Sequence, residues 1–230
     1  GGVITVSAPA REELSERLNI DPSKIEVMVP LAVPAPRGNP SQAELEHVRR
    51  KYALPEHFIL MIGTVEPRHN HQAVFAALAD AASPAGVVVC GRRTAWSDYL
   101  LGYARARRIA ARVDFIYELT PSDLPALFRL ARVFAYLPDA DAEASVVPVV
   151  EALRAGLPMV LSDTQVNREA AGEAAAYVRP EARGEVLAAL ENALEDVSWR
   201  RTMQERERRR AELFSEYAVA ERLMQIYTSL

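Results

Sequence analysis

Residues 133–161 read VFAYLPDADAEASVVPVVEALRAGLPMVL and contain strand, loop, helix and strand signals in succession. The β-branched and aromatic run Val133–Tyr136 predicts a buried strand. The next helix, over 147–155, has both ends marked, because Pro148 suits a first helical turn and Gly156 suits the position just after the last one. A helix that connects two buried strands in this way is typical of a parallel sheet.

The same alternation of short apolar runs and helical periodicity extends along the whole chain. Strands are predicted at 3–6, 25–29, 58–62, 86–90, 113–116, 133–136, 158–161 and 175–178. Helices are predicted at about 9–18, 40–53, 69–82, 95–110, 121–131, 147–155, 182–195, 198–213 and 217–230. This order predicts an α/β protein with a Rossmann-like, doubly wound parallel sheet and helices on both of its faces.

A proline-rich stretch divides this pattern near its start. Residues 29–40 read VPLAVPAPRGNP, and four prolines with one glycine are typical of a linker. We therefore expect residues 1–40 to be the end of a preceding domain followed by its linker. Residues 41–230 are expected to form the Rossmann-like domain with its C-terminal helices.

Composition disfavours several classes of protein. With 25% charged and 50% apolar residues, the chain is expected to be globular rather than disordered. Its net charge of -4, without a block of like charges, disfavours nucleic acid as a partner. The single cysteine, Cys90, rules out an intramolecular disulfide and is expected to be a buried apolar filler.

The sequence also bears on location. No apolar run approaches the ~18 residues that span a bilayer, and residues 1–6 lack the basic segment of a secretory signal. A cytoplasmic location is therefore expected, with the inner face of the membrane left open.

Ligands of doubly wound sheets bind beyond the carboxyl ends of the strands, so the turns after the strands hold the candidate residues. In the first such turn, Gly63 allows close backbone approach, while Arg68 and His69 place donors at the start of a helix. His69 and His71 are too few for a metal cluster without a cysteine or a third histidine nearby, so no metal is expected.

The loop and helix after the strand at 133–136 form the most informative turn. The first amides of the helix at 147–155 suit a phosphate group. Glu151 lies one turn inside that helix and Glu143 lies in the loop before it. Two carboxylates beside an anion-binding helix start suit a nucleotide sugar, which carries both phosphate and hydroxyl-rich rings. Two unrelated surface glutamates are the alternative interpretation.

These segments resemble the C-terminal half of a GT-B glycosyltransferase of family 4, the retaining group-1 enzymes. The turn at 63–70, GTVEPRHN, is similar to a family turn that reads Gly-Thr-x-Glu-Pro-Arg-Lys-Asn and that resembles turns of enzymes building bacterial surface polysaccharides. Each motif is weak alone, but their order is specific and covers nearly the whole chain. The other matching segments are 3–7, 24–30, 123–128, 143–151, 156–158 and 168–175.

The resemblance implies a role for each candidate residue. Glu143 would contact hydroxyls of the donor sugar, and Glu151 would contact the ribose. Arg68 and His69 would neutralise the diphosphate, and catalysis would depend on Glu143, Arg68 and His69, without a cofactor or metal. Donor-binding residues would be Gly63, Thr64, Arg68, His69, Gly91, Arg92, Tyr117, Glu118, Leu119, Ser145, Val146, Val147 and Glu151.

The resemblance also implies partners. The donor would be a GDP-, UDP- or dTDP-linked hexose or deoxyhexose, and the acceptor a glycan or a lipid-linked glycan. Because acceptors in this fold bind the N-terminal domain, the isolated chain is expected to be incomplete and inactive as a transferase. Peripheral membrane association of the full-length enzyme is left open.

The chain departs from the family pattern at the phosphate site. His69 replaces the family lysine, and Ala144 and Val146 replace two glycines of the family's Glu-Gly-Phe-Gly. If those positions need positive φ, each replacement costs ~1 kcal/mol or more. A second hypothesis therefore stands beside the transferase: a degenerate, non-catalytic domain that serves assembly or partner binding.

Overall fold

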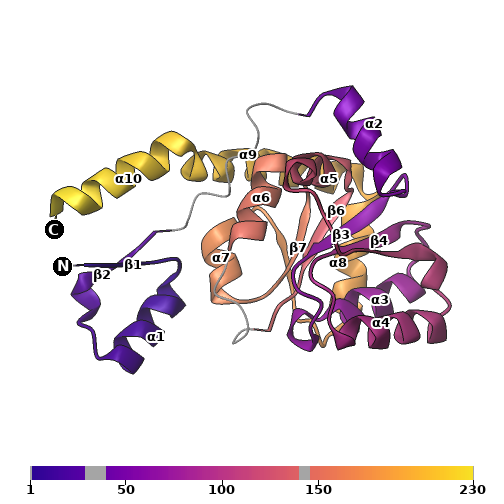
Figure 1. Ribbon diagram of the computed structural model, residues 1–230, viewed down its shortest axis with the longest axis horizontal. Helices are drawn as coiled ribbons and strands as arrows, with labels where there is room; N and C mark the ends of the chain where they lie inside the picture. The colour runs from indigo at the N-terminus through magenta and orange to yellow at the C-terminus, as the bar shows by residue number, and fades with distance from the viewer. Residues whose placement is uncertain (1, 29–39, 140–145, 230) are drawn as a thin grey trace.

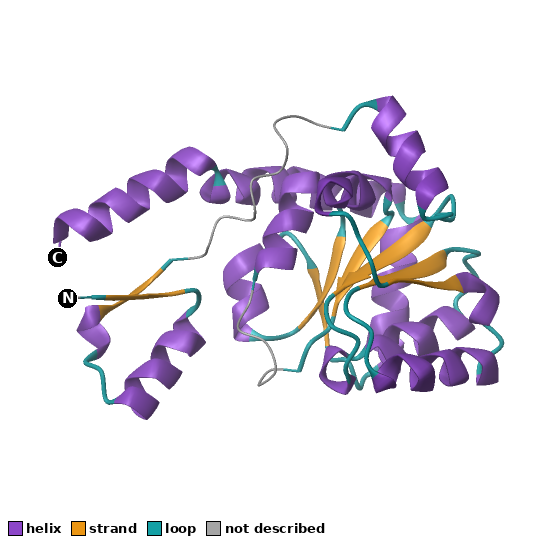
Figure 2. Cartoon of the chain, in the orientation of Figure 1, coloured by secondary structure: helices purple, strands orange, loops and turns teal. Residues whose placement is uncertain are grey.

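A computed structural model describes residues 2–28, 40–139 and 146–229 of the chain. Most of them form one parallel sheet covered by helices on both faces (Figures 1 and 2). The strands of this sheet are β3 (Phe58–Ile62), β4 (Gly86–Cys90), β5 (Val113–Ile116), β6 (Val133–Tyr136), β7 (Met159–Ser162) and β8 (Ala176–Val178). The helices are α1 (Ala8–Leu18), α2 (Gln42–Lys51), α3 (His71–Asp80), α4 (Ala95–Ala106), α5 (Leu124–Leu130), α6 (Val147–Ala155), α7 (Gln165–Ala171), α8 (Arg183–Glu195), α9 (Val197–Ala211) and α10 (Glu216–Ser229).

The strand order is β5-β4-β3-β6-β7-β8, with every neighbouring pair parallel. The chain builds outward from β3 to β5, returns to the middle, and builds the other way from β6 to β8. The predicted doubly wound α/β fold is thus confirmed. Its topological switch point lies between β3 and β6, where crossovers leave in opposite directions and a crevice for ligands can open.

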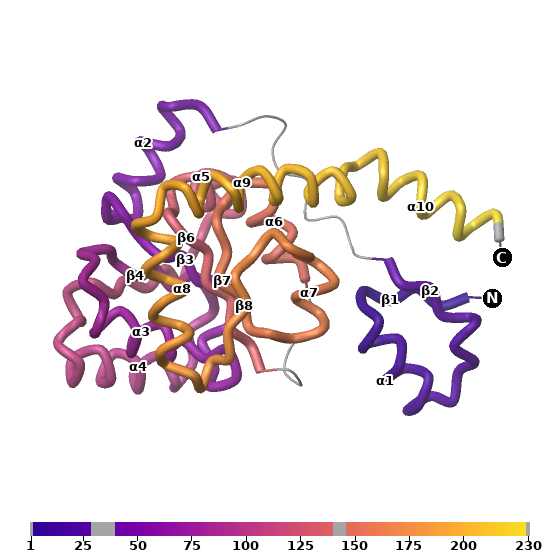
Figure 3. The backbone as a smooth tube through the Cα atoms, turned by 180° about the vertical axis from the view of Figure 1, so that it is seen from behind, coloured from indigo at the N-terminus to yellow at the C-terminus, as the bar shows by residue number. Residues whose placement is uncertain are grey.

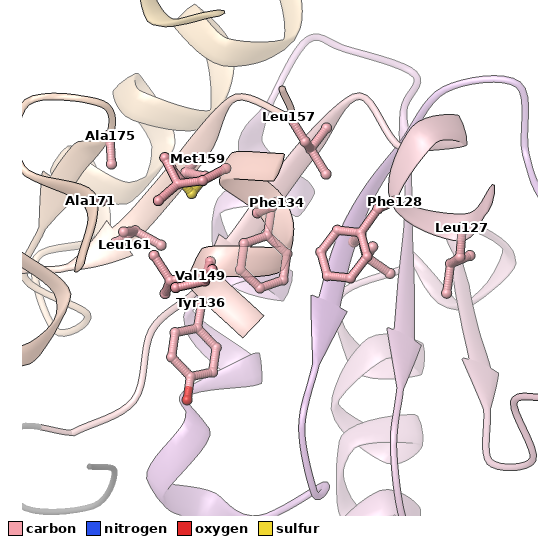
Figure 4. Packing of buried hydrophobic residues seen from close by; sticks show 14 of the residues in the cluster. Leu127, Phe128, Phe134, Tyr136, Val149, Leu157, Met159, Leu161, Ala171 and Ala175 are labelled. Atoms are coloured by element: carbon pink, nitrogen blue, oxygen red, sulfur yellow. The ribbon is translucent and has the colours of Figure 1, made fainter. Parts of the chain in front are cut away.

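The strands separate two apolar cores because alternate side chains point to opposite faces. In β3, Phe58 and Leu60 face the core under α2, α5, α6 and α7, whereas Ile59 and Met61 face the core under α3, α4 and α8. Figure 4 shows the first core, in which Phe128 of α5 packs on Phe134 of β6 with ring centroids 5.6 Å apart. Strands buried on both faces explain the continuous apolar runs in the sequence.

Helix α7 was not predicted, and several helices start later or end earlier than predicted, α4 ending at Ala106 instead of residue 110. The helix expected from residue 69 begins at His71, because Pro67–His69 form a 3-10 turn and Asn70 adopts a left-handed conformation with φ 52°. The helix expected from 121 begins at Leu124, after a 3-10 turn over Pro121–Asp123. Each of these 3-10 turns begins with a proline and comes directly before the α-helix.

The N-terminal segment forms a separate small unit. Strands β1 (Val3–Thr5) and β2 (Ile25–Val27) pair in parallel beside α1. The Ala8 amide donates to the Glu169 carboxylate of α7 at 3.0 Å, and Arg222 of α10 pairs with Glu26 at 2.8 Å. Helix α9 leads into α10, which extends away from the large sheet toward this unit (Figures 1 and 3).

Two three-residue strands bury too little surface to be stable alone. The division of the chain near residue 40 stays a prediction, since the expected linker, apart from its last residue, lies outside the described residues.

Candidate functional site at the switch point

Hydrogen bonds join the turns that leave β3 and β6. The Asn70 side-chain amide donates to the Leu137 carbonyl at 2.9 Å and to Asp139 Oδ1 at 2.6 Å. The Asp139 amide donates to the Arg68 carbonyl at 2.9 Å. The segments before α3 and before α6 therefore form one connected edge at the carboxyl ends of the central strands. The sequence motif at 63–70 contains Asn70 but predicted no role for it. In the structure Asn70 has a left-handed backbone conformation, and its side chain bonds to residues that follow β6.

Two glycines let the turns after β3 and β4 touch. The Gly63 amide continues the sheet by donating to the Cys90 carbonyl at 3.0 Å. A Cβ on Gly91 would lie 1.8 Å from the Gly63 carbonyl oxygen, so only glycine fits there. Gly63 itself has φ +145°, a conformation that side chains disfavour. The close approach expected of Gly63 is thus made to backbone, and it fixes the floor of the site.

Charges at this edge are mixed. Arg68 is exposed and donates from Nε to Glu66 at 2.7 Å, while Arg92, also exposed, has an Nη2 atom 3.9 Å from the other Glu66 oxygen. Glu66 therefore lies between two guanidinium groups. Asp139 adds a second carboxylate nearby.

The two histidines are buried. His69 is 6% exposed, and its Nδ1 lies 2.5 Å from the Thr64 carbonyl. Since a carbonyl oxygen only accepts, Nδ1 must carry a proton. His71 lies under it with ring centroids 6.0 Å apart. Burial, followed by the charge of His69, lowers the pKa of His71 to about 4.

Helix α6 begins at Val147, and no described side chain caps its start. Val146 is the N-cap residue, Pro148 lies in the first turn, and Gly156 ends the helix in a left-handed conformation, as predicted. Val146 has φ -98°, so replacing a family glycine here causes no left-handed strain. Glu151 is half-buried one turn inside the helix, and burial raises the pKa of its carboxyl, against the opposing effect of Arg154.

The turn after β5 carries the three candidate residues Tyr117, Glu118 and Leu119. Tyr117 is half-buried, stacks on Phe115 with centroids 5.6 Å apart, and has the Arg93 guanidinium 5.7 Å from its ring centre. Glu118 is exposed, whereas Leu119 packs against the core. The predicted residues Glu143 and Ser145, together with Ala144, lie outside the described residues.

Sequence reasoning missed two further contributors to this edge. Glu66 bridges the arginines, and the Thr94 hydroxyl, at the N-cap of α4, donates to the Val65 carbonyl. A threonine just before an amphipathic helix is a capping signal that could have identified the second. In the described part of the chain, no cluster of His, Cys, Asp and Glu could hold a metal ion. No described helix is long and apolar enough to cross a membrane.

A doubly wound sheet with a ligand-accessible edge at its switch point is the architecture of nucleotide-binding α/β domains. Residues 44–210 match the family described as Glycosyl transferases group 1, so the chain belongs to that family. It is 28% identical over 219 residues to O-antigen chain mannosyltransferase B of Escherichia coli, covering 93% of this chain and 56% of the relative. It is also 25% identical over 194 residues to O-antigen chain mannosyltransferase RfbU of Salmonella typhimurium, covering 83% of this chain and 50% of that relative.

Solved structures show the same fold. The crystal structure of HepE from Anabaena in complex with UDP-glucose superposes with a TM-score of 0.85 at 15% identity, covering 100% of this chain and 64% of that one. At this identity the likeness shows the GT-B type of fold alone. The chain spans about half the length of the curated relatives that it matches.

Proposed function

We propose that this chain is the donor-binding half of a retaining, family 4 glycosyltransferase. The donor is a nucleotide diphosphate hexose or deoxyhexose, and the acceptor is a glycan or lipid-linked glycan of a surface polysaccharide. Two relatives described as O-antigen mannosyltransferases and a neighbour crystallised with UDP-glucose support this substrate class.

One observation carries the proposal. The α6 N-terminus and the half-buried Glu151 follow β6 in the chain, and hydrogen bonds from Asn70 to Leu137 and Asp139 join the end of β6 to the turn that leaves β3 at Gly63. Amides at a helix start favour phosphate oxygens through the helix dipole. Glu151 would accept hydrogen bonds from a ribose, and its burial would make such bonds stronger than they are in water.

The chemistry that these residues supply is electrostatic. Retaining transfer breaks the bond between the sugar and the diphosphate, and negative charge develops on the leaving phosphate. Arg68, Arg92 and the α6 dipole would stabilise that charge. Since Arg68 is paired with Glu66, binding of a diphosphate would draw the guanidinium from the carboxylate to the phosphate. The burial of His69 and its bond to Thr64 favour a role in holding the turn.

The same observations favour one alternative, a degenerate domain that binds no donor. Glu66 and Asp139 offset part of the positive charge that a diphosphate needs, and His69 supplies no exposed cation. Nucleotide binding distinguishes the donor-binding domain from the degenerate domain, because only the first is expected to contact a ribose.

The experiment compares Glu151→Ala with Glu56→Ala, which removes an exposed carboxylate elsewhere. Isothermal titration calorimetry with UDP, GDP and dTDP, and with pyrophosphate, measures each affinity. Loss of charged hydrogen bonds to the ribose should weaken nucleoside diphosphate binding by about 10- to 100-fold and leave pyrophosphate binding unchanged. Equal affinities for both variants, or no heat with any nucleotide at millimolar concentration, would reject the proposed donor site.

A further inference from the structure

An arginine-lined cavity lies at the far end of α6 from the switch point. It has a volume of about 440 Å³, within the range of small-molecule sites, and Arg129, Arg154 and Arg208 line it. An adjoining cavity of about 120 Å³ adds Arg132 and Arg200 and shares Arg129 and Gln204 with the first. Helices α5, α6 and α9, which carry most of these residues, pack together at this end of the domain (Figures 1 and 3).

In the described part of the chain, Glu151 acts electrostatically on Arg154, and Glu195 and Asp196 act on Arg200, but none of these carboxylates lines either cavity. None of the five guanidinium groups forms an ion pair in that part of the chain, and the described residues lining the two cavities include no Asp or Glu. The chain as a whole is acidic, with a net charge of -4, so this local excess runs against its composition.

Helix ends explain part of the excess but not all of it. Arg129 donates to the Ala155 carbonyl at the end of α6, and Arg132 and Arg200 both donate to the Leu194 carbonyl near the end of α8. The C-termini of α5, α6 and α8 each contribute roughly -0.5 charge, less than two charges in all against five. Arg154 and Arg208 make no bond to another helix among the described residues.

Repulsion within the cluster is visible in its electrostatics. Burial first, and the nearby charge of Arg132 second, lower the pKa of Arg200, against the opposing effects of Glu195 and Asp196. An anion between these side chains would relieve the repulsion. Guanidinium groups bind phosphate oxygens with pairs of parallel hydrogen bonds, and phosphate is therefore the group that such a cavity fits best.

We propose that this cavity binds the phosphate group of a phosphorylated ligand, at a second anion site distinct from the donor site. Helix α6 separates the two, because its nine residues span roughly 14 Å. The ligand's phosphate belongs either to a soluble phosphorylated compound or to a lipid headgroup. The proposal does not depend on donor binding at the switch point.

The test follows backbone amides of the ¹⁵N-labelled 230-residue chain while sodium pyrophosphate is added at low salt. The amides of Gly156 and Gln204, which border the cavity, should shift and saturate. In an Arg154→Gln/Arg208→Gln variant the midpoint should rise by about tenfold or more, because two charged donors are lost. An Arg201→Gln/Arg209→Gln variant removes the same charge from exposed positions of α9 and should titrate like the unaltered chain.

A vesicle-binding experiment distinguishes a lipid headgroup from a soluble phosphorylated ligand. Cosedimentation with phosphatidylcholine vesicles, with and without phosphatidylglycerol, identifies a lipid source if only the anionic vesicles bind and Arg154→Gln/Arg208→Gln releases them. Pyrophosphate binding without vesicle binding identifies a soluble ligand. The proposal is overturned if Gly156 and Gln204 do not shift, or if both double variants weaken binding equally. Shifts at Gly63 or Val147 would report on the donor site separately.

Discussion

Glu207 is a buried carboxyl in the inward face of α9, and the proton that it keeps in the folded state should limit the stability of the protein at neutral pH. The residue is 0% exposed, and neither carboxylate oxygen has a hydrogen-bonding partner among the described residues. Burial raises the pKa of Glu207 to about 8, from an ordinary value of 4.5. The perturbation that tests this is Glu207→Gln, which keeps the shape and removes the titration.

The direction of the change in stability with pH follows from the folded state, in which Glu207 binds its proton more tightly than in the unfolded chain. The folded pKa is raised, so the stability contributed by Glu207 is fully present below pH 4.5 and is lost as the pH rises through about 8. Between pH 5 and pH 7 the unfolded chain ionises while the folded carboxyl stays protonated, which costs about 2.5 kcal/mol at 1.36 kcal/mol per pKa unit. The Gln variant avoids this cost.

Urea denaturation followed by circular dichroism at pH 5, 6 and 7 measures the free energy of unfolding. The difference between Glu207→Gln and the unaltered chain should grow by about 2.5 kcal/mol in favour of the variant from pH 5 to pH 7. Glu205→Gln, at an exposed position of the same helix, should show no such trend. A difference for Glu207→Gln that is constant across this range would show that the pKa of Glu207 is not raised in the folded protein.

Three further predictions concern the floor of the site. Because the pKa of His71 is lowered to about 4, its contribution to stability is present above pH 6.5 and is lost as the pH falls through 4. In His71→Phe the free energy of unfolding should therefore fall by about 3 kcal/mol less between pH 7 and pH 4 than in the unaltered chain, measured by the same denaturation. Gly91→Ala should destabilise the fold by about 1–3 kcal/mol in thermal unfolding because its Cβ would meet the Gly63 carbonyl, whereas Gly102→Ala, with open space around it in α4, should stabilise slightly. Cys90 is buried, with a pKa raised to about 11 by burial, so a thiol reagent should label it only in denaturant; rapid labelling of the native chain would contradict this.

Much of the fold could be predicted because the sequence pattern is unambiguous where strands are buried on both faces. The predicted limits of β3, β4, β5 and β6 agree with the structure. The sequence predicted the fold class but not the order of the strands in the sheet, because strand pairing depends on contacts between distant segments. The 3-10 turns before α3 and α5 escaped prediction because proline-led turns carry the same residues as a helix start.

Near the candidate site, the helix could be predicted from the sequence, whereas the burial of individual side chains could not. Helix punctuation at Pro148 and Gly156 placed the α6 start correctly. Burial of His69 was not foreseen, because a histidine beside an arginine in a turn gives no sign of which one points inward. Glu207 lies in an Arg/Glu-rich stretch of a kind typical of a solvated helix face, and only packing reveals that it is buried.

We propose a donor site at the carboxyl ends of β3 and β6. Its most direct test is a titration of the ¹⁵N-labelled chain with GDP-mannose, UDP-glucose and a dTDP-linked hexose, read residue by residue. At least one of them should shift the amides of Gly63, Gly91 and Val147 together, at submillimolar to millimolar concentration. If none of the three does so, or if the shifts fall only at other positions, the claim is contradicted.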